Sequence, residues 1–167
     1  LLVNHSSKIK NTHIVDSLVK RNIDIKKIFS PEHGFKGNIE RGKEFESNLY
    51  KIKNKSIPVI SMYGKNRVPK VEDLSELDVI IFDIQDVGAR FYTYISAMHN
   101  MMEKCAEIGI DFIILDRPNP NSGYIDGPVL NMEYQSYVGM HKIPIVHALT
   151  VGKLAMMIKG EKWIKNS

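Results

Sequence analysis

Short apolar runs alternate along the chain with segments in which apolar residues recur every three or four positions. The runs predict five β-strands: Leu1–Val3, Lys27–Phe29, Pro58–Met62, Val79–Ile84 and Phe112–Leu115. Two of the runs, DVIIFDI and DFIILD, are continuously apolar, which is typical of strands buried on both faces. Strands that alternate with helical patterns indicate a parallel α/β sheet.

The segments between the strands predict helices at Thr12–Arg21, Phe91–Ile108 and Thr150–Lys159, and a short turn or helix at Val71–Glu76. The longest helix has Phe91, Tyr94 and Cys105 on its apolar face, and Gly109 stands in the usual C-terminal position. Cys105 is therefore expected to be a core thiol. Residues 119–147 are punctuated by proline and glycine, and we expect extended loops or part of a lid there.

The composition is that of an ordinary globular chain, with 167 residues, 43% hydrophobic and 25% charged, enough for one domain with a sizeable core. The net charge of +4 fits an anionic ligand. No basic block is interleaved with aromatic residues, so nucleic acid is not an expected partner. The single cysteine excludes an internal disulfide, and no apolar run approaches the ~20 residues of a membrane span. Both ends look cut, so a missing signal peptide carries no information about export.

Polar clusters follow four of the predicted strands. In chain order they are Pro31-Glu32-His33-Gly34, then Tyr63-Gly64 with Arg67 close by, then Asp83-Ile84-Gln85-Asp86 with Gly88, Arg90 and Tyr92, and finally Asp116-Arg117-Pro118-Asn119-Pro120. Because ligands of open α/β sheets bind beyond the carboxyl ends of the strands, these clusters are expected to meet at one rim.

The aspartates also have a purely structural interpretation. Asp83 and Asp116 each follow an apolar strand directly, where an aspartate often caps a neighbouring helix or ties a loop. Asp86 stands two residues before Gly88 and can hold that turn. Both interpretations stay open at the level of the sequence.

Glu32 is the hardest of these residues to explain structurally, because a glutamate between proline and His-Gly is a poor cap. The same loop contains His33, which can bond a backbone carbonyl, orient Glu32 or touch a ligand. A glutamate in a partly desolvated pocket has a raised pKa and can protonate a leaving oxygen, as in glycoside hydrolysis. Asp86 is the best-placed second carboxylate.

Six other polar residues of the four clusters are predicted to bind substrate. Side chains suited to sugar hydroxyls or an acetamido group are Tyr63, Gln85, Tyr92 and Asn119. Arg90 or Arg117 can hold an anionic substituent by two parallel hydrogen bonds, or pair with the rim carboxylates as structure.

Several familiar sites are absent from the sequence. No dinucleotide fingerprint follows the first strand, and no P-loop or Gly-x-Ser-x-Gly elbow occurs. Metal binding by Glu32, His33, Asp83 and Asp86 is chemically possible, but the spacing matches no specific metal motif. We therefore expect no metal and no cofactor.

Four motifs, SPEHGFKG, PVISMYG, DVIIFDIQDVGARFYTYI and LDRPNPNSGYIDGP, resemble in this order the N-terminal domain of the NamZ/YbbC-like family. The resemblance runs over nearly the whole chain. It implies that residues 1–167 are one Rossmann-like catalytic domain, with an open, mostly parallel sheet and helices on both faces, and that a smaller C-terminal domain is absent from them.

Members of this family are bacterial exo-β-N-acetylmuramidases, which release terminal N-acetylmuramic acid from the non-reducing ends of peptidoglycan fragments. The resemblance implies that Glu32, the glutamate of Pro-Glu-His-Gly, takes part in catalysis. It gives an arginine the task of holding the lactyl carboxylate, with Arg90 preferred and Arg117 second. It also implies a role in cell-wall recycling and a periplasmic or secreted location.

The chain departs from the family pattern where members read His-Gly-Leu/Met-Thr-Ile-Gly-Glu-Leu-Ala. Here the sequence is HALTVGKLA, so that Ala148 replaces a glycine and Lys153 a glutamate. Lys43 follows Gly42 where a glutamate is common. Three hypotheses therefore stay open: the glycosidase, a non-catalytic module that binds muropeptides, and a metal-dependent hydrolase.

Overall fold

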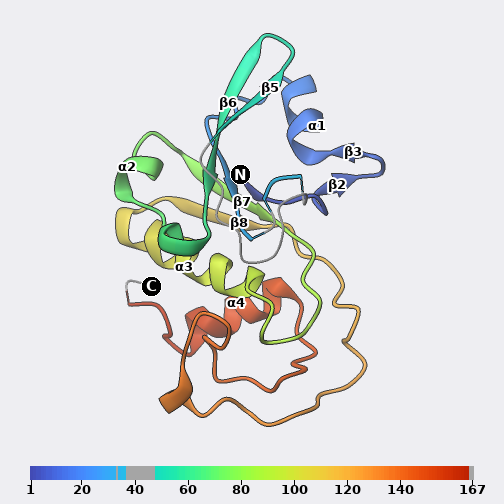
Figure 1. Ribbon diagram of the computed structural model, residues 1–167, viewed down its shortest axis with the longest axis vertical. Helices are drawn as coiled ribbons and strands as arrows, with labels where there is room; N and C mark the ends of the chain where they lie inside the picture. The colour runs from blue at the N-terminus through green and yellow to red at the C-terminus, as the bar shows by residue number, and fades with distance from the viewer. Residues whose placement is uncertain (33, 37–47, 166–167) are drawn as a thin grey trace.

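A six-stranded sheet forms the centre of the molecule, with the strand order β5-β6-β4-β1-β7-β8. The computed structural model describes residues 1–32, 34–36 and 48–165 (Figure 1). The sheet strands are β1 Leu2–Val3, β4 Ile28–Ser30, β5 Asn48–Ile52, β6 Lys55–Ser61, β7 Val79–Asp83 and β8 Asp111–Ile114. Every neighbouring pair is parallel except β5 and β6. The predicted mostly parallel α/β sheet is confirmed.

The order of the parallel strands creates a crevice at the carboxyl end of the sheet. From β1 the chain moves outward to β4 and β6 on one side, and then returns to add β7 and β8 on the other. This is the order of a Rossmann-type sheet, in which the direction of winding reverses beside the first strand. Ligands of such sheets bind at this point, beyond the carboxyl ends of the strands. Here the loops after β1 and β7 are joined by a hydrogen bond from the Gln85 amide to the Ser6 hydroxyl at 3.0 Å.

Helices cover both faces of the sheet, as predicted. On one face α1 (Ile14–Lys20) packs against Val3, Ile28 and Val59. The other face carries α2 (Val71–Leu74), α3 (Tyr94–Ile108) and α4 (Val151–Gly160) over Leu2 and Phe82. Within the described residues, no helix has the length and apolar character needed to cross a membrane.

Cys105 lies in this second core with 1% of its surface exposed, and burial raises the pKa of its thiol to about 12. The prediction of a core thiol is confirmed. Gly109 closes α3 in the left-handed conformation, with φ 76°, also as predicted. Phe91, in contrast, was wrongly predicted to lie on the apolar face of α3. It precedes the helix and is 55% exposed.

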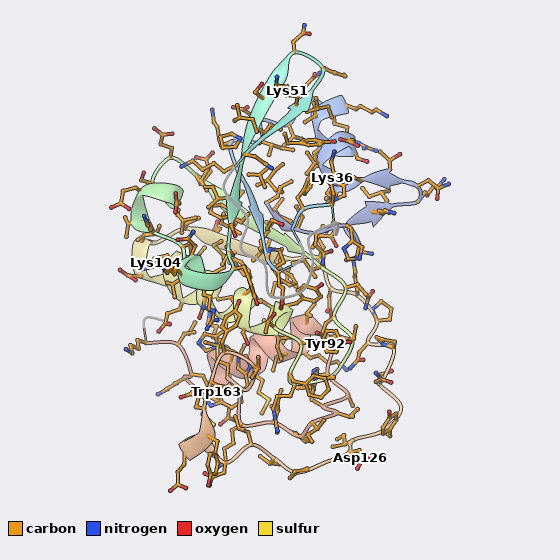
Figure 2. The ribbon with its side chains drawn as sticks, viewed as in Figure 1. Lys36, Lys51, Tyr92, Lys104, Asp126 and Trp163 are labelled. Atoms are coloured by element: carbon orange, nitrogen blue, oxygen red, sulfur yellow. The ribbon has the colours of Figure 1, made fainter. Side chains whose placement is uncertain are left out.

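Three strands were not predicted. β5 pairs with β6 as an antiparallel hairpin that projects at the top of Figure 1, and Figure 2 places Lys51 near its tip. Charged side chains of this kind are common on edge strands, where they hinder pairing with other chains. β2 (Lys8–Ile9) and β3 (Thr12–His13) form a separate two-stranded ribbon and are too short to produce a periodic pattern.

The long loop, residues 119–147, contains one 3₁₀ turn, η2 (Met132–Tyr134), and otherwise runs beside α4 as irregular chain with turns, bends and isolated bridges (Figure 1). The prediction of a loop here is confirmed. A second 3₁₀ turn, η1 (Gly64–Asn66), follows β6.

Asp116 caps α4, in line with the structural interpretation of this residue. Its Oδ2 accepts a hydrogen bond from the Thr150 hydroxyl at 2.7 Å, and its Oδ1 accepts one from the Gly152 amide at 2.8 Å. A Cβ atom on Gly152 would lie 2.7 Å from Cγ of Asp116. The close approach of this carboxylate therefore requires glycine at position 152.

Replacing Gly152 by alanine is expected to lower the free energy of unfolding by about 1–2 kcal/mol, the usual effect of losing a helix cap. Alanine has a higher helix propensity than glycine, so the variant would gain stability if there were no clash. A loss of stability therefore indicates the clash with Asp116. The matched control is Gly160→Ala at the other end of α4, where nothing lies within 4 Å of an added Cβ. Urea unfolding of both variants measures the difference, and equal stability would contradict the proposed crowding.

Candidate functional site

The crevice between β1 and β7 is lined by buried polar side chains. Oδ1 of Asn4, which follows β1, accepts hydrogen bonds from the Ser6 amide at 2.8 Å and the Ser6 hydroxyl at 2.6 Å. Asp83 at the end of β7 is 1% exposed and accepts a hydrogen bond from Nε of Arg117 at 2.6 Å. This bond raises the pKa of the Arg117 guanidinium. The structural pairing of Arg117 is thus observed, while its contact with substrate stays a prediction.

Asp86 is held in a fixed position beside a buried histidine. Its Oδ2 accepts a hydrogen bond from the Gly88 amide at 2.8 Å and lies 3.5 Å from Nε2 of His147. Asp86 and His147 are each only 3% exposed. The Leu149 amide donates to Nδ1 of His147 at 3.2 Å. In the neutral ring the proton is therefore on Nε2, facing Asp86.

Gln85 and Asn119, both predicted to bind substrate, make hydrogen bonds to the backbone of neighbouring loops. Nε2 of Gln85 donates to the Pro118 carbonyl at 2.9 Å. Nδ2 of Asn119 donates to the Leu149 carbonyl at 2.9 Å, and its Oδ1 accepts from the Asn121 amide at 2.8 Å. These two side chains hold the rim in shape, and their contact with a ligand stays a prediction.

Arg90 anchors the long loop to the start of α3. Its Nη1 donates to the carbonyls of Pro128 at 2.9 Å and Ile143 at 2.6 Å. A second anchor is the Ser96 hydroxyl, which donates to the Tyr137 carbonyl at 2.7 Å. The long loop is therefore held by hydrogen bonds from Arg90, just before α3, and from Ser96, in its first turn. Arg90 already satisfies backbone carbonyls, and its predicted role toward a substrate anion stays a prediction.

Glu32 follows β4 and is half-buried at the same edge of the sheet. Its Oε2 accepts a hydrogen bond from the Thr93 hydroxyl at 3.3 Å. Gly34, two residues later, has φ 73°, a left-handed conformation that suits glycine. His33 lies outside the described residues, so its predicted role stays a prediction.

Two tyrosines that were not predicted as site residues respond to the charge of Glu32. Burial raises the pKa of the Tyr94 hydroxyl, a hydrogen bond with Asn4 opposes the shift, and the negative charges of Glu32 and Asp86 add to it. Burial also raises the pKa of Tyr137, with the Arg67 guanidinium opposing and the charge of Glu32 adding to the shift. Tyr94 therefore lies in the field of both predicted catalytic carboxylates, and Tyr137 in that of Glu32.

The two tyrosines that were predicted to bind substrate follow β6 and β7. Tyr63 precedes η1 and is half-buried, and its charge state influences the pKa of Tyr137. Tyr92 is 46% exposed, and its ring centroid lies 5.7 Å from that of Phe91. Figure 2 shows Tyr92 on the side of the molecule along which the long loop runs.

Some buried polar atoms at this edge have no hydrogen-bond partner among the described residues. They include Oγ of Ser30, Oγ of Ser61, Oδ2 of Asp83, Oδ1 of Asp86 and Nε2 of His147. Buried polar groups are nearly always hydrogen-bonded in folded proteins. A cluster of unsatisfied donors and acceptors therefore favours a polar ligand at this edge. No group of three or more candidate metal ligands occurs in the part of the chain that the structure describes.

The local structure at Ala148 and Lys153 suits the glycine and the glutamate of the family pattern, and nothing in it explains the replacements. Ala148 has φ 56°, in the region that glycine occupies most easily. Lys153 is the third residue of α4, and its amide donates to the hydroxyl of the N-cap Thr150 at 3.3 Å. A glutamate at this position would complete a capping box. Lys43 lies outside the described residues.

Comparison with known sequences relates this chain to a family of cell-wall enzymes. Residues 1–167 match the family described as exo-beta-N-acetylmuramidase NamZ, N-terminal. The peptidoglycan beta-N-acetylmuramidase NamZ of Bacillus subtilis (strain 168) is 46% identical over 156 residues, which cover 90% of this chain and 37% of that protein.

Two solved structures, both DUF1343 family proteins from Bacteroides fragilis, have the same fold. The first has a TM-score of 0.87 and 36% identity, and the match covers 99% of this chain and 41% of that one. The second has a TM-score of 0.83 and 42% identity, covering 98% of this chain and 42% of that one. The chain thus spans well under half the length of the relatives it matches.

Proposed function

Because this chain belongs to the NamZ N-terminal family of exo-β-N-acetylmuramidases, we propose that its crevice hydrolyses the bond of a terminal N-acetylmuramic acid at the non-reducing end of peptidoglycan fragments. The observation that carries the proposal is the position of Glu32 at the carboxyl edge of the sheet, within a match that spans residues 1–167. In this proposal residues 1–167 are the catalytic domain of a protein that acts in the recovery of cell-wall sugars.

Glu32 acts in this proposal as the general acid that protonates the leaving oxygen. Its half-buried position reduces its contact with water. The Thr93 hydroxyl orients the carboxyl group through Oε2. Protonation of the leaving oxygen is the step that most glycosidases assign to such a carboxyl group.

Asp86 supplies the second carboxylate. Its Oδ2 is fixed by the Gly88 amide, while its buried Oδ1 has no partner among the described residues. A fixed negative charge stabilises the positive charge that develops on the sugar ring in the transition state. His147 also positions this carboxylate, since its Nε2 lies 3.5 Å from Oδ2 of Asp86. Tyr63 and the exposed ring of Tyr92 contact the sugar.

The full-length protein is expected to release N-acetylmuramic acid from fragments that carry this sugar at the non-reducing end. Fragments that end in N-acetylglucosamine are expected to stay intact, because an exo-acting site binds the terminal sugar. Chromatography of the products over time measures both. Binding of a muramic-acid disaccharide without any cleavage on long incubation would instead support the non-catalytic binding module.

Exhaustive chelation is expected to leave this hydrolysis unchanged. Asp83 and Asp86 each have one carboxylate oxygen engaged within the protein, and the described residues bring no third candidate metal ligand to them. The rate of sugar release is measured before and after treatment with a chelator, with buffer-treated protein as control. A loss that added divalent metal restores would favour the metal-dependent hydrolase.

A further inference from the structure

We propose that Arg67 binds the lactyl carboxylate of N-acetylmuramic acid and thereby selects this sugar over N-acetylglucosamine. The inference rests on the proposed function and adds the residue that determines specificity. N-acetylmuramic acid differs from N-acetylglucosamine by its lactyl ether, which ends in a planar carboxylate. A guanidinium group matches that shape with two parallel N–H donors.

The other two arginines of the rim are engaged within the chain. Arg117 forms an ion pair of 2.6 Å with the buried Asp83. Arg90 donates from one nitrogen to two backbone carbonyls and so fastens the long loop. Turning either side chain toward a ligand would leave a buried partner unsatisfied, which is costly.

Arg67 has a different environment. It follows η1, and its guanidinium carbon lies 4.6 Å from the ring centroid of Tyr137. Among the residues that the structure describes, no carboxylate forms an ion pair with it. An arginine stacked on an aromatic face keeps its N–H edge available for an anion.

Glu32 and the stack of Arg67 on Tyr137 are both tied to the start of α3. The Thr93 hydroxyl donates to Oε2 of Glu32 at 3.3 Å, and the Ser96 hydroxyl, three residues later, donates to the Tyr137 carbonyl at 2.7 Å. A sugar whose glycosidic oxygen faces Glu32 therefore has a cation within reach of its substituents. Tyr63, already predicted to contact the sugar, belongs to the same group of side chains.

The stacked pair is fixed by one face of α3. The Ser96 hydroxyl donates to the Tyr137 carbonyl at 2.7 Å, and Nδ2 of Asn100 donates to the Arg67 carbonyl at 3.0 Å. Ser96 and Asn100 stand one helical turn apart and are 1% and 6% exposed. Two segments that are 70 residues apart in the sequence are thus held together before any ligand binds, which lowers the entropic cost of binding.

The test compares the full-length wild type with Arg67→Met, Arg67→Lys and the control Arg21→Met. Arg21 is an exposed arginine at the end of α1. Calorimetry measures binding of N-acetylmuramic acid, its uncharged lactyl amide and N-acetylglucosamine, and kcat/KM is measured on the matching 4-nitrophenyl glycosides.

Arg67→Met is expected to weaken binding of N-acetylmuramic acid by about 10- to 100-fold, the usual range for a charge-assisted hydrogen bond. Binding of the two uncharged sugars is expected to stay at the wild-type level. Arg67→Lys is expected to fall in between, because it keeps the charge but not the paired donors. Arg21→Met is expected to behave as wild type.

An equal loss for charged and uncharged sugars would overturn the proposal, because the stack on Tyr137 would then be only structural. Unchanged binding would overturn it as well, as would a wild type that does not bind N-acetylmuramic acid. Charge-specific loss of binding in a protein that hydrolyses none of the glycosides would support Arg67 and refute the proposed glycosidase. Normal hydrolysis with unaltered sugar preference would refute Arg67 alone.

Discussion

Replacing Glu32 by glutamine is expected to lower kcat for release of N-acetylmuramic acid from a natural disaccharide by roughly a thousandfold, within the usual range for loss of a general acid. Glutamine has nearly the same shape as glutamate and can still accept the hydrogen bond from the Thr93 hydroxyl. It has no acidic proton to give to the leaving oxygen. The fold and the affinity for sugar are therefore expected to be retained.

The choice of leaving group separates an acid from a residue that only shapes the pocket. A 4-nitrophenolate leaves readily without protonation, so Glu32→Gln is expected to lose much less activity on the 4-nitrophenyl glycoside than on the disaccharide. Steady-state kinetics on both substrates measures the difference, and thermal unfolding checks the fold. An equal loss on both substrates, or near-normal turnover of the disaccharide, would remove Glu32 from the role of acid.

The parallel part of the sheet is predictable from the sequence, because strands buried on both faces leave continuous apolar runs such as that of Val79–Asp83. The edge strand Asn48–Ile52 leaves no such run, since it exposes much of its surface and includes the charged Lys51. Phe91 fits the helical period of the residues that follow it, but the helix begins only at Tyr94. The spacing of apolar residues alone does not determine at which residue a helix begins.

The candidate acid site is predictable only in part. Glu32 is recognisable because its neighbours in the sequence already make it a poor cap. The partners of Arg90 are not, since the carbonyls it binds come from residues 38 and 53 positions away. Tyr137 likewise comes near Glu32 only through a long-range contact, because the long loop is anchored on α3. Such contacts depend on tertiary packing, which no local pattern encodes.

Gly88→Ala is expected to have the largest effect of any glycine substitution at the rim. Gly88 has φ 75°, and a Cβ atom there would lie 2.2 Å from Oδ1 and 2.6 Å from Nδ2 of Asn119. Those two atoms bond the Asn121 amide and the Leu149 carbonyl, so Asn119 cannot move aside without losing both hydrogen bonds. The expected loss of unfolding free energy is about 3 kcal/mol, the sum of backbone strain and overpacking.

The same substitution is expected to reduce kcat/KM of the folded protein, because the Gly88 amide holds Oδ2 of Asp86 at 2.8 Å. Gly109→Ala is the matched control: its φ is 76°, but nothing lies within 4 Å of an added Cβ. It bears the same backbone strain, about 1–2 kcal/mol, without the clash, and it lies at the far end of α3 from the crevice. Urea unfolding and steady-state kinetics compare the two variants. Equal loss of stability in both variants would contradict the clash with Asn119, and full activity of Gly88→Ala would contradict the role of the Gly88 amide in positioning Asp86.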